Sequence, residues 1–320
     1  MTMLGHDEPW KQWRDACTGE RMHHAWMLAG KRGLGKMHFA LQAARELVAE
    51  PGISQPEGGH PDIIVLDRLP KDDKEEKKRV EGKPYETKRN IAVSQIRAVQ
   101  QRLTTRPTLG SRRAIIIDPS DDLEKGASNA LLKSLEEPPA GTYFLLVTHR
   151  PARLLPTIRS RCRILRFPTI PDGELAKLLN EKAADADPAT QRAAIIAANG
   201  SPGAALDFVE RDLGALYSLM QRILEQGDPD FELRGQLAQT LGARPNRERI
   251  QATLDLSRSV LANALDSADR TSYPAIVEAH AELVTLTGQA PTYNFDAGLL
   301  VAEIGTLLAS AAPLRERANV

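Results

Sequence analysis

The chain has 320 residues, which is long enough for two or three domains with their own apolar cores. Lysine plus arginine and aspartate plus glutamate number 42 each, so the overall charge excludes a general attraction to nucleic acid or membrane and leaves only local patches. The two cysteines, Cys17 and Cys162, lack metal-ligand spacing, and no apolar run reaches the roughly 18 residues of a membrane helix. The sequence therefore predicts a cytoplasmic protein without a disulfide framework, a membrane partner or a signal peptide.

Four short apolar runs alternate with helical segments in the first half of the chain. The runs lie at residues 24–30, 62–66, 113–118 and 143–148, and the helical segments at about 38–50, 92–104 and 121–137. Because apolar strands that alternate with helices are typical of a parallel sheet covered on both faces, we predict an α/β domain. Pro138 and Pro139 cannot continue a helix and therefore end the last segment.

The first predicted strand leads into a glycine-rich loop, "GKRGLGKMHF" at 30–39. Gly30, Gly35 and Lys36 fit the frame G-x-x-x-x-G-K of a phosphate-binding loop, in which backbone N–H groups, a helix N-terminus and the lysine hold phosphate. Met37 stands where such a loop carries a hydroxyl for Mg²⁺, and a thioether is a poor ligand for a hard cation. We predict a loop that descends from a phosphate-binding loop but does not hold Mg-ATP.

Residues 71–90 form the most charged stretch, in which 14 of 20 residues are charged, eight of them basic and six acidic. The stretch has almost no apolar side chain to bury, so we predict a solvated loop or a disordered insertion. A nucleic-acid-binding segment is the alternative, which the interleaved acidic residues disfavour.

The third apolar run ends in "IIIDPSDD" at 115–122. Asp118 is placed to assist a metal ion beside the glycine loop, but Pro119 occupies the position of the glutamate that polarises water in many hydrolysing enzymes. Asp121 and Asp122 could replace that glutamate. Two acids just before a helix are more typical of cap residues, which the helix dipole favours, and we predict that role.

The densest local charge lies at 150–166, with six arginines and no acid: Arg150, Arg153, Arg159, Arg161, Arg163 and Arg166. The cluster could bind nucleic-acid phosphate or a nucleotide on a neighbouring subunit, and for most of the six we expect solvation. Cys162 could be an activated thiolate in this electropositive setting, but no partner cysteine or base accompanies it. We therefore predict a small packing residue.

Downstream of residue 166 the pattern becomes helical. The spacing of apolar residues over 171–206 predicts a small helical unit that ends at the glycine- and proline-containing turn 198–206. The same kind of spacing over 207–320 predicts about five amphipathic helices. The predicted architecture is an α/β domain, a small helical lid and a helical C-terminal domain.

Several motifs of the chain resemble one known family. They are "HHAWMLAGKRGLGK" (23–36), "HPD" (60–62), "AVSQIR" (92–97), "IIIDPSDDLEKGASNALLKSLEEPP" (115–139) and "FLLVTHRPARLLPTIRSRCRILRF" (144–167). Over about residues 20–206 the chain resembles the delta-prime subunits of the bacterial DNA polymerase III clamp loader, an AAA+ family. A weaker similarity lies at "YNFDAGLLVAEI" (293–304). "NALLKSLEEPP" followed by "SRC" separates clamp-loader subunits from other AAA+ proteins.

The resemblance implies a stator subunit in a hetero-pentameric ring with delta and gamma or tau subunits, which loads a sliding clamp on primer-template DNA. In that family the arginine of the Ser-Arg-Cys motif is a finger for ATP on the adjacent subunit. Here this is Arg161, flanked by Ser160 and Cys162. The implied domains are an AAA+ domain at 1–166, a lid at 167–206 and a helical collar at 207–320.

The chain departs from the ATP-hydrolysing members of the family at three points. Met37 replaces the hydroxyl, Pro119 replaces the glutamate, and Ala204 stands where those subunits carry a second nucleotide-sensing arginine. The four cysteines of a zinc module that many relatives carry near 50–65 are also missing, so we expect neither zinc nor ATP as a cofactor. The alternatives are a self-sufficient AAA+ ATPase acting on DNA, and a DNA-binding module built on the 150–166 arginines.

Overall fold

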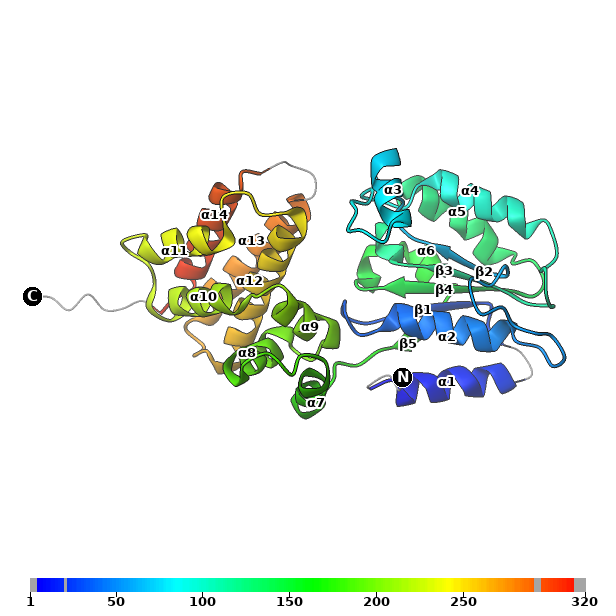
Figure 1. The fold of residues 1–320 in the computed structure, drawn as a ribbon, viewed down its shortest axis with the longest axis horizontal. Helices are drawn as coiled ribbons and strands as arrows, with labels where there is room; N and C mark the ends of the chain where they lie inside the picture. The colour runs from blue at the N-terminus through cyan, green and yellow to red at the C-terminus, as the bar shows by residue number, and fades with distance from the viewer. Residues whose placement is uncertain (1–4, 20–21, 291–294, 314–320) are drawn as a thin grey trace, which may run out of the picture. The chain divides into compact units, whose positions relative to one another are not determined.

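A computed structural model describes residues 5–19, 22–290 and 295–313. The chain forms two compact units, residues 1–169 and 170–320 (Figure 1). The first unit contains the sheet and the second is helical within its described residues. The predicted division into three domains, with boundaries at 166 and 206, stays a prediction.

The sheet of the first unit has five parallel strands in the order β2-β3-β4-β1-β5. The strands are β1 (Ala25–Ala29), β2 (Ile63–Leu66), β3 (Arg113–Ile117), β4 (Thr142–Thr148) and β5 (Arg163–Arg166). The first four confirm the predicted runs. The sequence did not indicate β5 because it is a short edge strand in which only Leu165 is buried.

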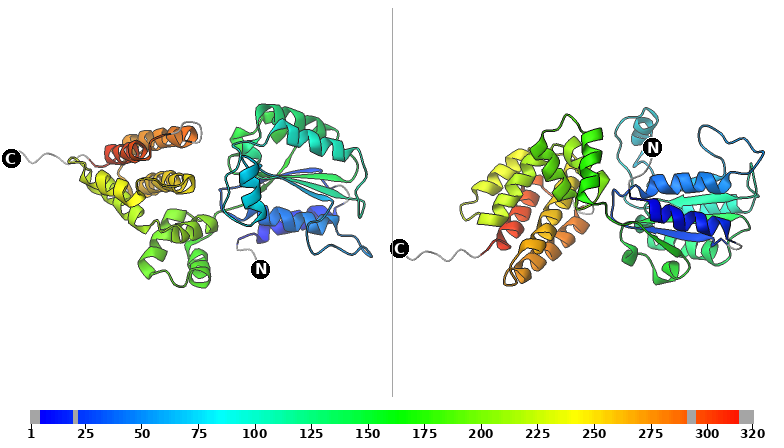
Figure 2. Two further views of the ribbon diagram at one scale, coloured as in Figure 1. Left: turned by 45° about the horizontal axis from the view of Figure 1, so that its top comes forward. Right: turned by 90° about the horizontal axis from the view of Figure 1, so that it is seen from below.

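Helices cover both faces of this sheet, as predicted (Figure 2). The helices of this unit are α1 (Asp7–Thr18), α2 (Lys36–Val48), α3 (Asp73–Val80), α4 (Val93–Leu103), α5 (Lys125–Glu136) and α6 (Pro156–Arg159), with short 3₁₀ turns η1 (Ser120–Asp122) and η2 (Pro151–Arg153). Successive strand residues point to opposite faces. Ile116 thus joins a core with α1 and α2, whereas Ile115 and Ile117 join a core with α4 and α5.

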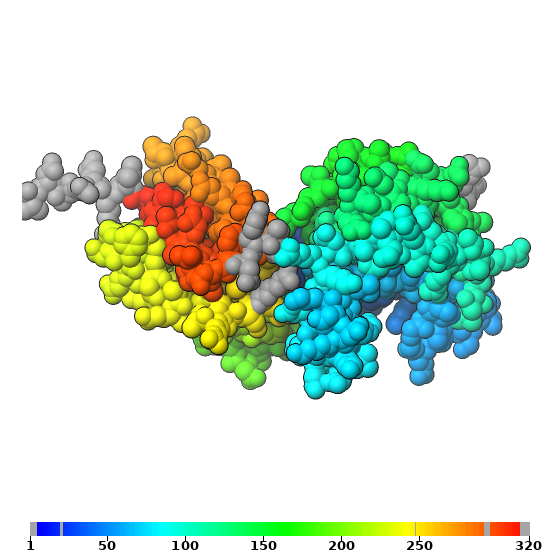
Figure 3. Space-filling model, turned by 90° about the horizontal axis from the view of Figure 1, so that it is seen from above, coloured from blue at the N-terminus to red at the C-terminus, as the bar shows by residue number. Residues whose placement is uncertain are grey.

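The charged segment 71–90 contains an ordered helix, so the prediction of a loop or disordered insertion was wrong. The Asp72 carboxylate caps α3 by accepting from the backbone N–H groups of Lys74 and Glu75, each at 3.0 Å. The buried Glu75 carboxylate accepts from Lys78 Nζ at 2.7 Å and from the Glu86 backbone N–H at 2.7 Å. Ion pairs and a cap thus form this surface segment, seen in light blue to cyan in Figure 3.

The second unit consists of helices within its described residues. They are α7 (Asp172–Lys182), α8 (Pro188–Ala198), α9 (Pro202–Glu210), α10 (Gly214–Gln226), α11 (Glu232–Leu241), α12 (Arg247–Ser267), α13 (Tyr273–Gln289) and α14 (Ala297–Ser310). The five helices from α10 to α14 agree with the number predicted for 207–320. The stretch "GQAPTYN" at 288–294, which we expected to separate two of these helices, lies partly outside the described residues. Helix α8 packs on α10 and α12.

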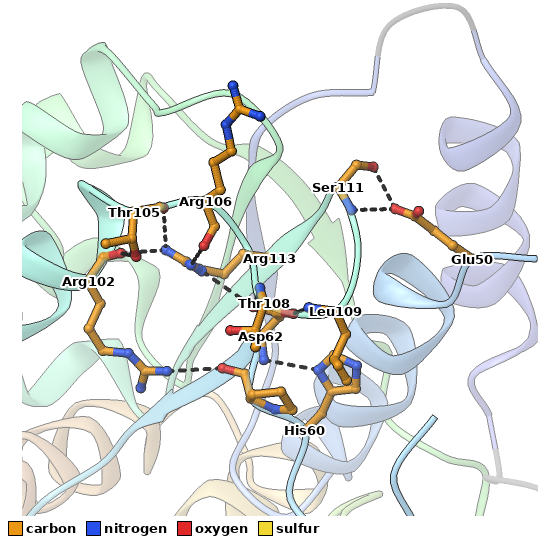
Figure 4. A network of polar contacts seen from close by, with 11 residues as sticks. Glu50, His60, Asp62, Arg102, Thr105, Arg106, Thr108, Leu109, Ser111 and Arg113 are labelled. Carbon is orange, nitrogen blue, oxygen red and sulfur yellow. Dashed lines mark hydrogen bonds and ion pairs between the residues drawn. The ribbon is translucent and has the colours of Figure 1, made fainter. Parts of the chain in front are cut away.

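A buried polar network joins the beginnings of β2 and β3 (Figure 4). The Asp62 carboxylate accepts from the backbone N–H groups of Thr108 at 2.6 Å and Leu109 at 2.8 Å. The buried Arg113 guanidinium lies 3.9 Å from Asp62. It also donates to the backbone carbonyls of Arg102 at the end of α4 and of Thr105 and Arg106 in the turn that follows. The network therefore anchors that turn to the sheet.

We predict that Asp62→Ala lowers the free energy of unfolding by about 2–4 kcal/mol, because two backbone N–H groups and a buried guanidinium lose a buried carboxylate. Urea unfolding measures this loss. Glu50→Ala is the control, since the Glu50 carboxylate accepts from Ser111 at the exposed end of the same network, and its loss should be much smaller. Equal losses for the two variants would contradict the anchoring role.

Candidate functional site

The predicted glycine loop lies between β1 and α2, at the carboxyl end of the parallel strands. Gly33 and Gly35 have φ angles of 80° and 73°, a left-handed backbone that favours glycine. A Cβ on Gly30 would lie 2.7 Å from the Phe167 carbonyl oxygen, so only glycine fits against the chain that follows β5. The strand, loop and helix of a phosphate-binding loop are therefore all present.

Lys36 is the first residue of α2 and its side chain turns back into the loop. Its buried Nζ donates to the carbonyl oxygens of Gly30 at 2.7 Å and Lys31 at 2.5 Å. Burial lowers the pKa of Lys36 to about 8, and the negative charges of Asp118 and Asp121 oppose that shift. The cation that would contact a nucleotide phosphate is thus already bonded within its own loop.

Met37 is a packing residue and not a metal ligand. Its side chain packs against the apolar core that contains Trp13, Phe39 and Leu47. Neither its position nor its thioether offers the oxygen that Mg²⁺ prefers. The residue that stands at the sequence position of the missing hydroxyl is therefore part of the packing of the core.

Asp118 follows β3, and its carboxylate interacts electrostatically with the Lys36 ammonium. Burial raises the pKa of Asp118 to about 6, against the opposing effect of the Lys36 charge. Pro119 follows it and carries no carboxylate. The end of β3 thus supplies one acid but no glutamate beside it.

Asp121 and Asp122 do not cap α5, so that prediction was wrong. Helix α5 begins at Lys125, after Glu124. The Asp121 carboxylate instead accepts from Thr148 Oγ1 at 2.6 Å and from the His149 backbone N–H at 2.5 Å, which ties η1 to the end of β4. Asp122 pairs with Arg68 at 3.5 Å. Both carboxylates are thus engaged by the protein itself.

Two histidines beside the loop were not predicted as site residues. Burial, assisted by the Lys36 charge, lowers the pKa of His149 to about 4, so its ring is neutral at neutral pH. The buried His6 ring lies edge-on to Phe167, with Nε2 2.6 Å from the Leu34 carbonyl oxygen. Strand β4 ends at the same sheet edge as the loop, and this shared edge was the available signal for His149.

Arg161 lies in the turn between α6 and β5. Its Nη1 donates to the Thr157 carbonyl oxygen at 2.9 Å, and its Nη2 lies 2.7 Å from Oε1 of Glu136, the last residue of α5. The Arg161 side chain is 34% exposed. Ser160 is exposed, and its hydroxyl donates to the same Thr157 carbonyl at 3.1 Å. The guanidinium is oriented by the chain but reachable from solvent.

Cys162 is a packing residue, as predicted. It packs against the core beneath α5, and burial raises the pKa of its thiol to about 12, which excludes a thiolate at neutral pH. Of the other arginines of 150–166, Arg163 is engaged within the chain, since its guanidinium lies over the Trp26 ring, 4.9 Å from the ring centroid.

Ala204, the third predicted departure, lies in the helical unit. Ala204 is in the first turn of α9, where its backbone N–H donates to Ser201 Oγ at 3.3 Å. In the described ranges, no cluster of three or more His, Cys, Asp or Glu side chains could hold a metal ion. Nor does any helix there have the length and apolar character needed to span a membrane.

The five-stranded parallel sheet and the glycine loop define an α/β domain with the fold of a phosphate-binding loop, followed by a helical unit. The model of the family "DNA polymerase III, delta subunit" matches residues 5–171. The chain therefore belongs to this family, and the resemblance to delta-prime subunits is confirmed.

Two curated delta-prime subunits illustrate the similarity. The one from Pseudomonas aeruginosa is 34% identical over 168 residues, which are 48% of this chain and 46% of that protein. The one from Escherichia coli K12 is 28% identical over 261 residues, 77% of this chain and 70% of that protein. The Pseudomonas match thus spans less than half of the relative.

A solved structure supports the fold. It is a gamma-subunit-related protein of DNA polymerase III from Thermotoga maritima, with a TM-score of 0.52 at 18% identity, covering 95% of this chain and 99% of that one. At this identity the likeness concerns the fold alone.

We predict that the wild type exceeds Asp118→Asn in free energy of unfolding at pH 4, and that this difference falls by about 1–3 kcal/mol between pH 4 and pH 7. The folded-state pKa of about 6 lies above the usual 3.8, so between these two pH values the folded protein holds a proton that the unfolded chain has lost. This stabilisation is complete below about pH 4 and is lost as the pH rises through 6. Urea unfolding of both proteins across this range measures it. Parallel pH profiles would contradict the buried site of Asp118.

Proposed function

We propose that this chain is a subunit of the DNA polymerase III clamp loader that does not hydrolyse ATP itself and donates Arg161 to ATP bound by a neighbouring subunit. The observation that carries the proposal is the contrast between two cations. The Lys36 ammonium is buried and bonded to its own loop, whereas the Arg161 guanidinium is one-third exposed. The first serves the fold of this chain and the second can reach another molecule.

The chemistry of the loop argues against hydrolysis by this chain. A nucleotide phosphate would have to displace two carbonyl oxygens from Lys36. Met37 and Pro119 would supply neither an Mg²⁺ ligand nor a group to polarise water. We therefore propose that this chain uses no ATP, magnesium or zinc as a cofactor.

The chemistry of Arg161 suits donation to a neighbour. A guanidinium is charged at every physiological pH and offers a planar fork of donors to phosphate oxygens. Supplied from an adjacent subunit, it stabilises the charge that develops on the transferred phosphoryl group. Ser160 and Cys162 serve as its structural context, the cysteine by fixing the turn in the core.

The partners follow from the family. We propose a hetero-pentamer with delta and gamma or tau subunits, which contacts the sliding clamp and primer-template DNA in the cytoplasm. In the predicted collar, α13 exposes Tyr273, Val277 and Val284, and α14 exposes Leu299. Such apolar side chains on neighbouring helices are suited to subunit contacts.

For the isolated chain we predict no measurable heat of Mg-ATP binding in isothermal titration calorimetry at micromolar concentrations, and no turnover. Met37→Thr restores the hydroxyl alone and should not produce turnover, because the glutamate remains absent. Micromolar affinity with hydrolysis by the unmodified chain would contradict the proposal and support a self-sufficient ATPase.

For the reconstituted loader we predict that Arg161→Ala partly lowers the ATPase that clamp and primed DNA stimulate. The loss should be partial because the other sites of the ring keep their own fingers. Arg153→Ala, an exposed arginine of the same basic segment, is the control and should retain the rate. Unchanged ATPase with Arg161→Ala in a correctly assembled complex would refute the finger role.

A further inference from the structure

The Arg161 guanidinium has an anionic partner within its own chain. Glu136 Oε1 lies 2.7 Å from Nη2, and the two side chains are 49% and 34% exposed. Both residues sit on rigid supports, since Leu135 next to Glu136 and Ile158 in α6 are buried in one core. The ion pair therefore joins two fixed elements at the surface, where another anion can approach.

We propose that Glu136 is a competing counter-ion that holds the Arg161 finger until the phosphate of a neighbouring subunit's ATP replaces its carboxylate. The inference rests on the proposed function of Arg161. It adds a regulatory residue, because the exchange sets how readily the finger engages.

The geometry supports exchange rather than permanent pairing. Nη1 is held by the Thr157 carbonyl oxygen, which orients the fork without neutralising it. Nη2 contacts the Glu136 carboxylate, and a phosphate oxygen that approaches from this side would accept from the same Nη2. The two anions therefore compete for one side of the fork.

The strength of the pair fits a reversible hold. An ion pair between partly exposed side chains is weak, because water screens the charges and both side chains lose freedom. A polyphosphate carries more negative charge and accepts two parallel hydrogen bonds from a guanidinium. It should displace Glu136 once the interface closes, whereas the carboxylate should prevail while the interface is open.

The experiment compares Glu136→Gln with Glu137→Gln in the reconstituted loader. Glu137 is the adjacent exposed glutamate, and its side chain has no ion pair within the described part of the chain. We expect Glu136→Gln to raise the ATPase without clamp and DNA about two- to five-fold, the range of a weak surface ion pair. The fully stimulated rate and the control should stay unchanged.

A double variant links the effect to the finger. Adding Arg161→Ala to Glu136→Gln should abolish the rise, since no guanidinium remains to be released. A lower rate with Glu136→Gln would assign the residue to positioning and overturn the competition, as would no change or a rise that persists without Arg161. If Arg161→Ala alone leaves the stimulated rate intact, the proposed function fails as well, which distinguishes the two failures.

Discussion

The bonds from the Lys36 ammonium to the carbonyl oxygens of its own loop are the interaction on which the site depends. A buried cation needs partners, and this chain supplies them from Gly30 and Lys31. Burial also sets the protonation of the surrounding groups: it keeps His149 neutral, and it raises the pKa of Asp118 in spite of the Lys36 charge. The loop keeps the shape of a phosphate-binding loop, while the ammonium of its lysine is bonded to the protein itself.

The surface of the same unit is organised differently. Arg161 and Glu136 come from separate elements and meet where solvent reaches both. A pair of this kind contributes little to the stability of the fold, because water screens its charges. The division between a self-contained loop and an accessible guanidinium is what we propose for a subunit that assists its neighbour's reaction.

The centre of the fold could be predicted from local sequence patterns. Features that depend on contacts between residues far apart in the sequence could not. Apolar runs indicated β1 to β4, and the glycine frame indicated the loop. Strand β5 was not predicted because its sequence, RILR, begins and ends with arginine and has one buried side chain, that of Leu165. Segment 71–90 was misjudged because the backbone N–H of Glu86 and the side chain of Lys78 offset the cost of burying Glu75. The partners of Asp121 and Arg161 lie far along the chain, and charge patterns do not identify them.

The most direct test of this account is a structure of the reconstituted loader with clamp, primed DNA and a non-hydrolysable ATP analogue. We predict that the Arg161 guanidinium lies within about 3 Å of a terminal phosphate oxygen of the nucleotide on the adjacent subunit. Lys36 should still bond to the carbonyl oxygens of Gly30 and Lys31. Nucleotide and Mg²⁺ bound in the loop of this chain, or Arg161 remote from the neighbour's phosphate, would contradict it.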